Sequence, residues 1–265
     1  MMTKPLYVVP SLKAKGQALI EAKEWADSIG AIYARRQKRT TAELRRDYGD
    51  QFLVYAAQGP KLFRPDGTHL FSLNMAQLRI DHLRKGQTDH FLEAIDAGQM
   101  TSFLDCTCGF GADSIVASFA LSPKATVTAL EVSPLMAAVT GWGFSHFVHE
   151  AADVTAALRR ITLYCCDYRD FLQSLPDRSY DVIYLDPMFD KPILTSCQFQ
   201  PVRDILEHHQ LTHEDIVLAL RKARHRVVVK GRYFRQLQAA FPQIHVFGGK
   251  YSRVHYAVWE VEGNG

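Results

Sequence analysis

The second half of the chain alternates short apolar segments with segments of helical periodicity. Strands joined by helices favour a parallel sheet covered by helices, because a parallel return needs a long crossover connection. Several of the apolar segments end in a polar residue, and such sheets bind ligands at the carboxyl ends of their strands. The pattern therefore predicts an α/β fold with a mainly parallel, seven-stranded sheet. The expected strands are Ser102 to Cys106, Val127 to Glu131, Ile161 to Cys165, Val182 to Asp186, Arg226 to Lys230, Ile244 to Phe247 and Tyr256 to Val261.

Residues 1–73 predict a separate, small α/β lobe that precedes a larger domain over residues 74–265. Gln17 to Ile29 has helical periodicity, and Thr40 opens a second helix with a Ser/Thr-x-x-Glu capping box. A helical segment from Asn74 to Ala97 connects the lobe to the larger domain. The expected strands of the lobe are Leu6 to Val9, Ala31 to Ala34, Gln51 to Ala57, Lys61 to Phe63 and His69 to Phe71, with turns at Gly59-Pro60 and Pro65-Asp66-Gly67.

The composition is that of a globular protein. Its 47% hydrophobic and 22% charged residues exclude extensive disorder and a fibrous class. The amino terminus carries no apolar signal segment, and no run of about 18 apolar residues occurs, which predicts a cytoplasmic protein without a membrane partner. The five cysteines lack zinc-ribbon spacing, so reduced thiols are expected. His208, His209 and His213 could suggest a metal site, but we expect surface roles for them and assign no metal.

Positive charge is concentrated in the small lobe. Between Arg35 and Arg46, six cations face a single acid, Glu43. A basic surface of this kind attracts polyanions, and phosphate contacts position a nucleic acid without reading its sequence. A solvated charged face is the alternative interpretation. The candidate phosphate contacts are Arg35, Arg36, Lys38 and Arg39.

A glycine-containing turn follows the first strand of the larger domain, from Asp105 to Asp113. Gly109 and Gly111 would let the backbone approach a ligand closely, although a tight turn without a ligand is the alternative. Glu131 ends the next strand twenty residues later, where a carboxylate can accept hydrogen bonds from both hydroxyls of a ribose; an exposed acid at the strand end is the alternative. Ser114 takes the third glycine position of the dinucleotide-binding pattern, which disfavours a nicotinamide cofactor.

Two further strands also end in acids. Asp167 can accept a hydrogen bond from an adenine amine or cap a helix, and these roles are compatible. The fourth strand leads into Asp186-Pro187-Met188-Phe189. An amine on an aromatic base is a poor nucleophile, and Asp186 and the carbonyl of Pro187 could hold its hydrogens while Phe189 stacks on the base. An ordinary turn after a strand is the alternative.

These motifs resemble those of class I S-adenosylmethionine-dependent methyltransferases, and among them the bacterial 16S ribosomal RNA guanine-N2 methyltransferases with an Asp-Pro-Met-Phe signature. The resemblance spans Lys61 to Trp259 and implies a Rossmann-like core, S-adenosylmethionine as the cofactor and small-subunit ribosomal RNA as the partner. It implies that Asp186 is the site of transfer and also contacts the cofactor. It also implies that Lys230 faces the crevice and that Arg84, Lys85 and Lys230 join the substrate and RNA contacts. The implied cofactor residues are Asp105, Gly109 and Gly111 in the turn, Ala112 and Asp113 at the methionine moiety, Glu131 and Val132 at the ribose, and Asp167 and Tyr168 at the adenine.

Three positions differ from the family pattern. Ala112 and Val132 stand where the family has arginine, and Asp190 stands where it has proline. Two other interpretations therefore remain open. The first is a non-catalytic RNA-binding or ribosome-assembly protein with a methyltransferase fold, and the second is an amino-methyltransferase for DNA adenine or a small molecule. Binding of S-adenosylmethionine tests the former, and the identity of the methylated substrate tests the latter.

Overall fold

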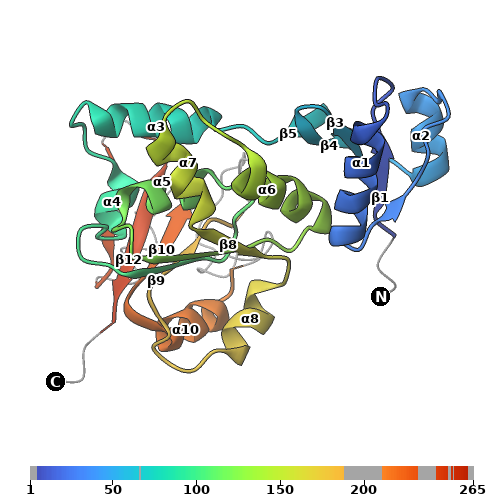
Figure 1. Cartoon of the computed structure of the whole chain (residues 1–265). Helices are drawn as coiled ribbons and strands as arrows, with labels where there is room; N and C mark the ends of the chain where they lie inside the picture. Colours follow the sequence, from blue (N-terminus) through green and yellow to red (C-terminus); the bar gives the residue numbers. More distant parts are fainter. Residues whose placement is uncertain are drawn as a thin grey trace, which may run out of the picture. The chain divides into compact units, whose positions relative to one another are not determined.

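The computed structural model describes residues 5–65, 67–187, 211–231, 243–249, 252 and 254–261. The chain forms two compact units, one from residues 1–73 and 133–150 and the other from residues 74–132 and 151–265 (Figure 1). The first unit is larger than the predicted lobe because it includes helix α6 (Pro134–His146). Each unit has its own sheet.

The sheet of the first unit has five strands: β1 (Tyr7–Pro10), β2 (Ile32–Tyr33), β3 (Phe52–Ala56), β4 (Gly59–Arg64) and β5 (Gly67–Leu70). Their order is β2-β1-β3-β4-β5. β1 pairs in parallel with both β2 and β3, whereas β4 pairs antiparallel with β3 and β5. Helices α1 (Gln17–Ser28) and α2 (Thr41–Tyr48) supply the two crossovers that the parallel strands require.

The helices α1 and α2 lie on opposite sides of β1 (Figure 1). Trp25 of α1 contacts Tyr55 at 5.4 Å between ring centroids, while Leu44 of α2 packs with Val9 and Phe52 on the other face. The predicted capping box at Thr40 is confirmed. Its hydroxyl accepts from the N–H of Glu43 at 3.3 Å, and its own N–H donates to the Glu43 carboxylate at 2.7 Å.

The predicted turn at Gly59-Pro60 is wrong, because these residues begin β4 and pair with the end of β3. Gly59 has a φ of 102°, and a Cβ there would overlap the ring of Trp142 in α6. A Cβ at Gly143 would likewise overlap the ring of Phe71. Glycine is therefore needed at both places for α6 to approach the sheet. Among the described residues, no helix is both long enough and apolar enough to cross a bilayer.

The sheet of the second unit has seven strands, as predicted, and their order is β11-β12-β10-β9-β6-β7-β8. β12 is antiparallel to both β10 and β11, and the remaining neighbours are parallel. The strands span Ser102–Asp105 (β6), Thr126–Leu130 (β7), Ile161–Tyr164 (β8), Tyr180–Leu185 (β9), Ala223–Gly231 (β10), His245–Phe247 (β11) and His255–Glu260 (β12). The helices are α3 (Asn74–Arg84), α4 (His90–Ala94), α5 (Ala112–Ala120), α7 (Ala152–Arg159), α8 (Tyr168–Ser174) and α10 (His213–Lys222).

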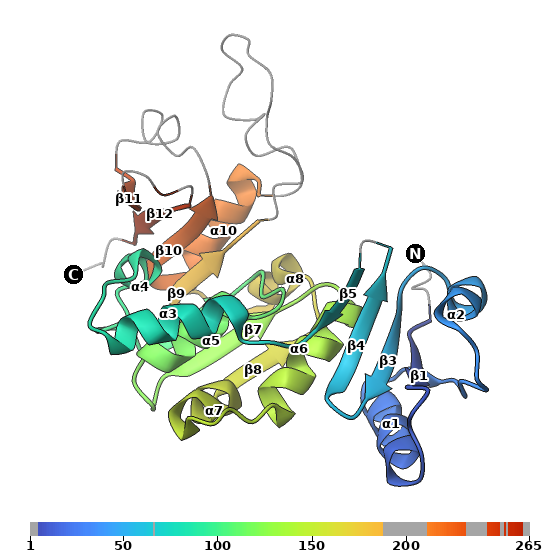
Figure 2. The ribbon, with the colours of Figure 1, turned by 90° about the horizontal axis from the view of Figure 1, so that it is seen from above.

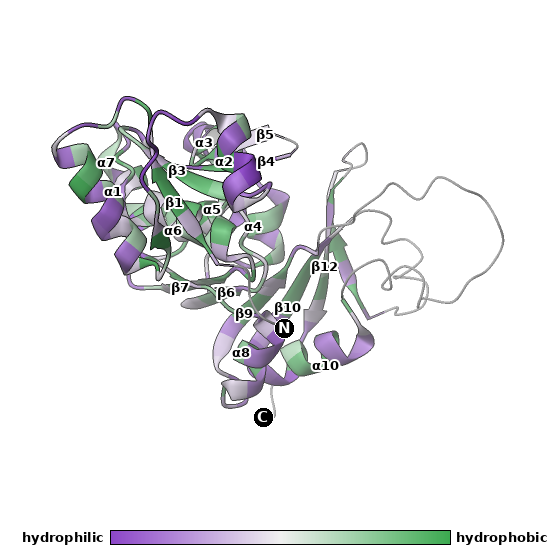
Figure 3. Cartoon of the chain, turned by 90° about the vertical axis from the view of Figure 1, so that its right-hand side faces the viewer, coloured by the Kyte–Doolittle hydropathy of each residue, from purple (hydrophilic) through white to green (hydrophobic). Residues whose placement is uncertain are grey.

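Helices cover both faces of this sheet, with α3 and α5 on one side and α8 and α10 on the other (Figure 1, Figure 2). On one face, Ile183 and Val227 pack with Leu172 of α8 and Ala219 of α10. The other face carries aromatic rings, among them Tyr184, whose ring centroid lies 5.0 Å from that of Phe91 in α4. In Figure 3, β10 and β12 are largely hydrophobic and α10 is mostly hydrophilic, as expected for a buried sheet under amphipathic helices.

Candidate functional site

The four acids predicted at strand ends follow four neighbouring parallel strands. Asp105 ends β6, and Glu131, Asp167 and Asp186 come shortly after β7, β8 and β9. From β6 the chain moves outward through β7 and β8 and then returns to β9 on the other side of β6. Open α/β sheets bind their ligands at the carboxyl ends of the strands where the strand order reverses in this way. The fold thus brings the predicted groups to one edge of the sheet.

The turn after β6 is held in place by the acid after β7. Gly109 and Gly111 have φ values of 56° and 83°, in the left-handed region that favours glycine. The N–H of Gly109 donates to Oε2 of Glu131 at 2.8 Å. Glu131 therefore anchors the glycine turn, in addition to the ribose contact predicted for it.

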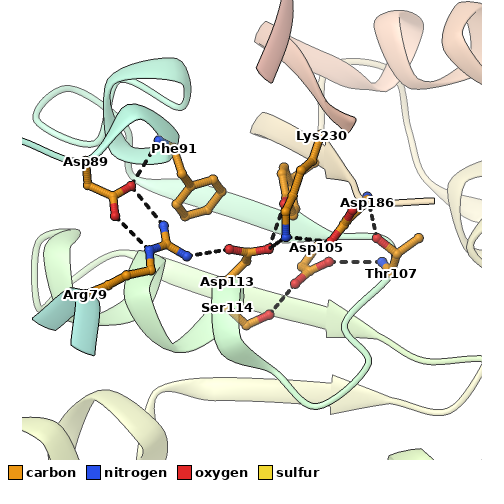
Figure 4. Close-up of polar contacts among 10 residues, drawn as sticks. Arg79, Asp89, Phe91, Asp105, Thr107, Asp113, Ser114, Asp186 and Lys230 are labelled. Atoms are coloured by element: carbon orange, nitrogen blue, oxygen red, sulfur yellow. Dashed lines mark hydrogen bonds and ion pairs between the residues drawn. The ribbon is translucent and has the colours of Figure 1, made fainter. Parts of the chain in front are cut away.

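Asp105 lies buried beneath this turn (Figure 4). Its carboxylate accepts from the N–H of Thr107 at 3.0 Å and from the hydroxyl of Ser114 at 2.6 Å. Burial raises the pKa of Asp105 to about 7, although both hydrogen bonds favour the ionised form. Ser114, which takes the place of a third glycine, thus supplies a donor to the acid that begins the turn.

Asp113, in the first turn of α5, is surrounded by donors (Figure 4). Arg79 donates to Oδ1 at 2.5 Å, and Oδ2 accepts from Lys230 at 3.0 Å and from the hydroxyl of Tyr184 at 2.7 Å. Burial opposes ionisation of Asp113, but the two cations outweigh it and hold the pKa of the carboxyl below its usual value. Arg79 also donates to both oxygens of Asp89, which caps α4. This network fixes the start of α5.

Asp186 is tied to the same network through Lys230. Nζ of Lys230 lies 2.7 Å from Oδ2 of Asp186, and the N–H of Asp186 donates to the hydroxyl of Thr107 at 2.6 Å. Within the described part of the chain, Oδ1 of Asp186 receives no hydrogen bond. Burial raises the pKa of Asp186, and the Lys230 ammonium offsets only part of that rise. Pro187 follows directly, whereas Phe189 lies outside the described residues, as do Met188 and Asp190.

The remaining predicted cofactor residues occupy the same edge of the sheet. Asp167 caps α8 by accepting from the N–H of Arg169 at 2.7 Å, so its predicted capping role is confirmed. Tyr168 begins α8, and Ala112 begins α5. Val132 has 66% of its surface exposed directly after the buried Glu131. An exposed apolar side chain beside an acid suits the apolar face and the hydroxyls of a nucleoside.

The predicted basic residues have different surroundings. Arg84 is paired with Asp153 at 2.8 Å, and Lys85 is exposed. In the first unit, Arg39 pairs with Asp47 at 2.7 Å. His213 begins α10, while His208 and His209 lie outside the described residues. The absence of a metal stays a prediction.

Sequence reasoning did not assign a role to Arg79, Asp89, Thr107 or Tyr184. Arg79 is ten residues from Asp89 and 34 from Asp113, so no local spacing joins them. Tyr184 reads as one more apolar residue of a buried strand. Thr107 was the easiest of the four to find from the sequence, because it lies inside the Asp105 to Asp113 turn.

The residues present fit S-adenosylmethionine. The anchored turn of Gly109 and Gly111 allows close backbone approach, and Glu131 and Asp167 offer acceptors on adjacent strands. Asp105 and Asp186 add carboxylates at the ends of β6 and β9, which belong to the same edge of the sheet. Acceptors for an adenosine and negative groups for a cation therefore lie along one edge.

Known proteins support this assignment. The family model of SAM-dependent methyltransferases, SAM_MT, matches residues 70–255. The uncharacterized protein YpiP of Bacillus subtilis is 30% identical over 227 residues, which cover 85% of this chain and 88% of that protein. Ribosomal RNA small subunit methyltransferase J of Pseudomonas aeruginosa is 28% identical over 217 residues, covering 79% of this chain and 78% of that protein.

A solved structure shows the same fold along nearly the whole chain. The SAM-dependent methyltransferase NGO1261 from Neisseria gonorrhoeae matches with a TM-score of 0.61 and 15% identity, covering 98% of this chain and 97% of that one. At this identity the similarity concerns the fold alone. The Rossmann-like sheet, the strand-end acids and the family match agree. The chain belongs to the SAM-dependent methyltransferase family, with S-adenosylmethionine as its cofactor.

Proposed function

We propose that this enzyme methylates an exocyclic amine of a nucleobase, namely N2 of guanine in 16S ribosomal RNA. The observation that carries the proposal is the position of Asp186, at the carboxyl end of β9 beside the glycine turn, with Oδ2 held by Lys230 at 2.7 Å. The name of the Pseudomonas aeruginosa relative, ribosomal RNA small subunit methyltransferase J, supports the RNA class of the substrate. A ribosomal RNA substrate also supports a cytoplasmic site of action.

Asp186 and Pro187 prepare the amine. S-adenosylmethionine supplies an electrophilic methyl group together with its leaving group, so no strong base is needed at the start. Oδ1 of Asp186 and the carbonyl of Pro187 accept the two amine hydrogens and turn the nitrogen lone pair toward the methyl group. The methylated nitrogen is acidic, and its proton passes to Asp186 or to water. Burial raises the pKa of Asp186, which makes the carboxylate a better proton acceptor.

Lys230 and Thr107 orient Asp186. The ammonium fixes Oδ2, and the hydroxyl of Thr107 accepts from the backbone N–H at 2.6 Å. Both partners come from other strand ends, so the carboxylate is oriented before the substrate arrives. Acceptors that are already in place cost little reorganisation during the reaction.

The decisive test is mass mapping of 16S ribosomal RNA from a strain that lacks the gene. We expect one guanine to lose a single methyl group and to regain it when the wild-type gene is restored, but not when the Asp186→Ala gene is restored. An unchanged methylation map would rule out ribosomal RNA as the substrate.

An assay in vitro separates the two alternatives. Each reaction contains purified enzyme and S-adenosylmethionine with a labelled methyl group. The substrate is free 16S RNA, small subunits or single-stranded DNA. We expect label in RNA and none in DNA. Label in DNA adenine would favour the other amino-methyltransferase, and calorimetry without detectable cofactor binding would favour the non-catalytic assembly protein.

A further inference from the structure

We propose that the first unit holds a second RNA site, a cavity that takes one base and the adjoining phosphates of single-stranded RNA. This inference rests on the proposed RNA substrate. It concerns a place outside the methyltransferase sheet, at the carboxyl ends of β1 and β2. The cavity has a volume of about 560 Å³, within the range of small-molecule sites.

The cavity lies where the chain leaves the parallel strands. The loop after β1, one side of α1 and the loop after β2 form its walls, and Ser11, Leu19 and Tyr33 are among the residues that line it. The chain runs from β1 to β2 on one side of the sheet and from β2 to β3 on the other, since α1 and α2 cover opposite faces. The carboxyl edge of such parallel strands is the usual position for a ligand.

The walls are basic. Lys23, Arg35, Arg36 and Lys38 line the cavity, and none of its lining residues is acidic. Arg35 and Lys38 are exposed, so their charges are open to an anion from solvent. Together these four cations suit two successive phosphates of a nucleic acid backbone.

Apolar side chains occupy the same walls. Leu12, Leu19 and Ile20 have exposed fractions of 60%, 38% and 51%, and the ring of Tyr33 lines the cavity with them. A free phosphate would not need these contacts. A nucleotide would, because its base presents an apolar face that packs on aromatic and aliphatic groups.

An uncommon backbone turn carries Lys38. Gln37 and Lys38 have φ values of 50° and 63°, and the N–H of Arg39 donates to the carbonyl of Arg36 at 3.0 Å, which closes a turn of type I′. Glycine and asparagine usually fill these positions, whereas longer side chains are disfavoured there. Disfavoured backbone of this kind is concentrated at binding sites.

Arg39 holds this turn. Its guanidinium donates to Asp47 and to the hydroxyl of Tyr48, each at 2.7 Å, and to the carbonyl of Arg36 at 3.1 Å. It also contacts the carbonyl of Arg35. Arg39 is therefore a positioning residue, although the sequence predicted a phosphate contact. Lys38, at the tip of the turn, is exposed and lines the cavity.

The test measures binding of a fluorescein-labelled single-stranded RNA of ten nucleotides by anisotropy over a range of KCl concentrations. Lys38→Glu should weaken binding at least fivefold and reduce the salt slope by about 0.7, the value for one phosphate contact of a single strand. Lys124→Glu makes the same charge change on an exposed lysine of the second unit and should leave binding unchanged. Equal effects of these two variants would overturn the site.

A second pair of variants tests the base. Leu12→Asn removes an exposed apolar side chain from the cavity without changing charge. Val148→Asn is the matched control, because Val148 is apolar, 73% exposed and lies in the first unit outside the cavity. Only Leu12→Asn should weaken RNA binding, and its salt slope should equal that of the wild type. Equal binding of the ten-nucleotide RNA and an abasic strand would overturn the base contact.

Binding to phosphatidylglycerol vesicles tests a lipid as the ligand instead. Loss of vesicle binding in Lys38→Glu with intact RNA binding would identify a lipid site.

These outcomes are separable from those for the proposed function. If the methylation map is unchanged but the cavity variants lose RNA binding, the second site stands and the ribosomal assignment fails. If one guanine loses its methyl group but Lys38→Glu binds RNA like the wild type, the second site alone fails. Circular dichroism of each variant establishes that it folds.

Discussion

Nζ of Lys230 lies 2.7 Å from Oδ2 of Asp186, and the same ammonium also donates to Asp113 at 3.0 Å. One cation is therefore shared by the acid that starts a helix and the acid that ends a strand. The arrangement links Asp186, the proposed site of methyl transfer, to the network that fixes α5. It also makes the titration of Asp186 dependent on a residue in β10.

Lys230→Met should lower the rate of methyl transfer about 10- to 100-fold, because Asp186 loses the group that orients it. The ammonium lowers the pKa of Asp186, so its removal raises that pKa further. If the ionised carboxylate is the active form, the acid limb of the pH–rate profile moves toward higher pH. The measurement is kcat against pH, with Lys124→Met as the control. An acid limb that stays in place would contradict the coupling.

Asp186→Ala should leave the Kd for S-adenosylmethionine within about threefold of wild type while turnover falls about 100-fold or more, since the amine loses an acceptor. Asp186→Asn keeps an acceptor oxygen and should retain more activity than the alanine variant. Calorimetry and a single-turnover assay separate the two effects. Wild-type turnover in Asp186→Ala would remove this residue from the transfer step.

Glu131→Gln should weaken cofactor binding by about 10- to 100-fold, because a charged acceptor is lost at the predicted ribose contact and at the anchor of Gly109. RNA affinity should be unchanged. Glu24→Gln, an exposed position of α1, serves as the control. If cofactor affinity stays the same in calorimetry, Glu131 has neither role.

Asp105→Asn should flatten the pH dependence of stability. Burial raises the pKa of Asp105 to about 7, so the folded state binds a proton that the unfolded state has released. The contribution of this carboxyl is thus most favourable below about pH 4 and is lost as pH rises to about 7, a difference of roughly 4 kcal/mol, most of which falls above pH 5. Urea unfolding at pH 5 and pH 8 measures it.

The asparagine variant has no such proton to lose and should gain stability relative to wild type at the higher pH. Asp27→Asn changes an exposed acid and should behave like wild type. Parallel pH trends for wild type and Asp105→Asn would show that Asp105 does not titrate in this range.

Much of the second unit could be predicted because its signals are local. Each strand is a short apolar run, and the acids that follow four of them reach the same edge through the rules of parallel sheets. The capping box at Thr40 was equally local, since all of its bonds join residues three apart. Patterns of this kind can be recognised in the sequence without any knowledge of the tertiary structure.

What could not be predicted depends on contacts between distant segments. Arg79 reaches Asp113 across 34 residues, and Lys230 reaches it across 117. The role of Gly59 depends on the ring of Trp142, and a glycine beside a proline otherwise indicates a turn. Arg39 was grouped with its neighbours by charge, and its ion pair with Asp47 could not be seen from that grouping.

The first unit is built from two separate segments of the chain, because helix α6 belongs to it. The residues of α6 come after two strands of the methyltransferase sheet, yet Trp142 and Gly143 pack against Gly59 and Phe71. During synthesis, the ribosome must therefore translate about 80 residues beyond the amino-terminal sheet before α6 can pack against it. A fragment ending at residue 73 would expose the apolar surface that α6 covers. The first unit is therefore not complete as one continuous segment of the chain.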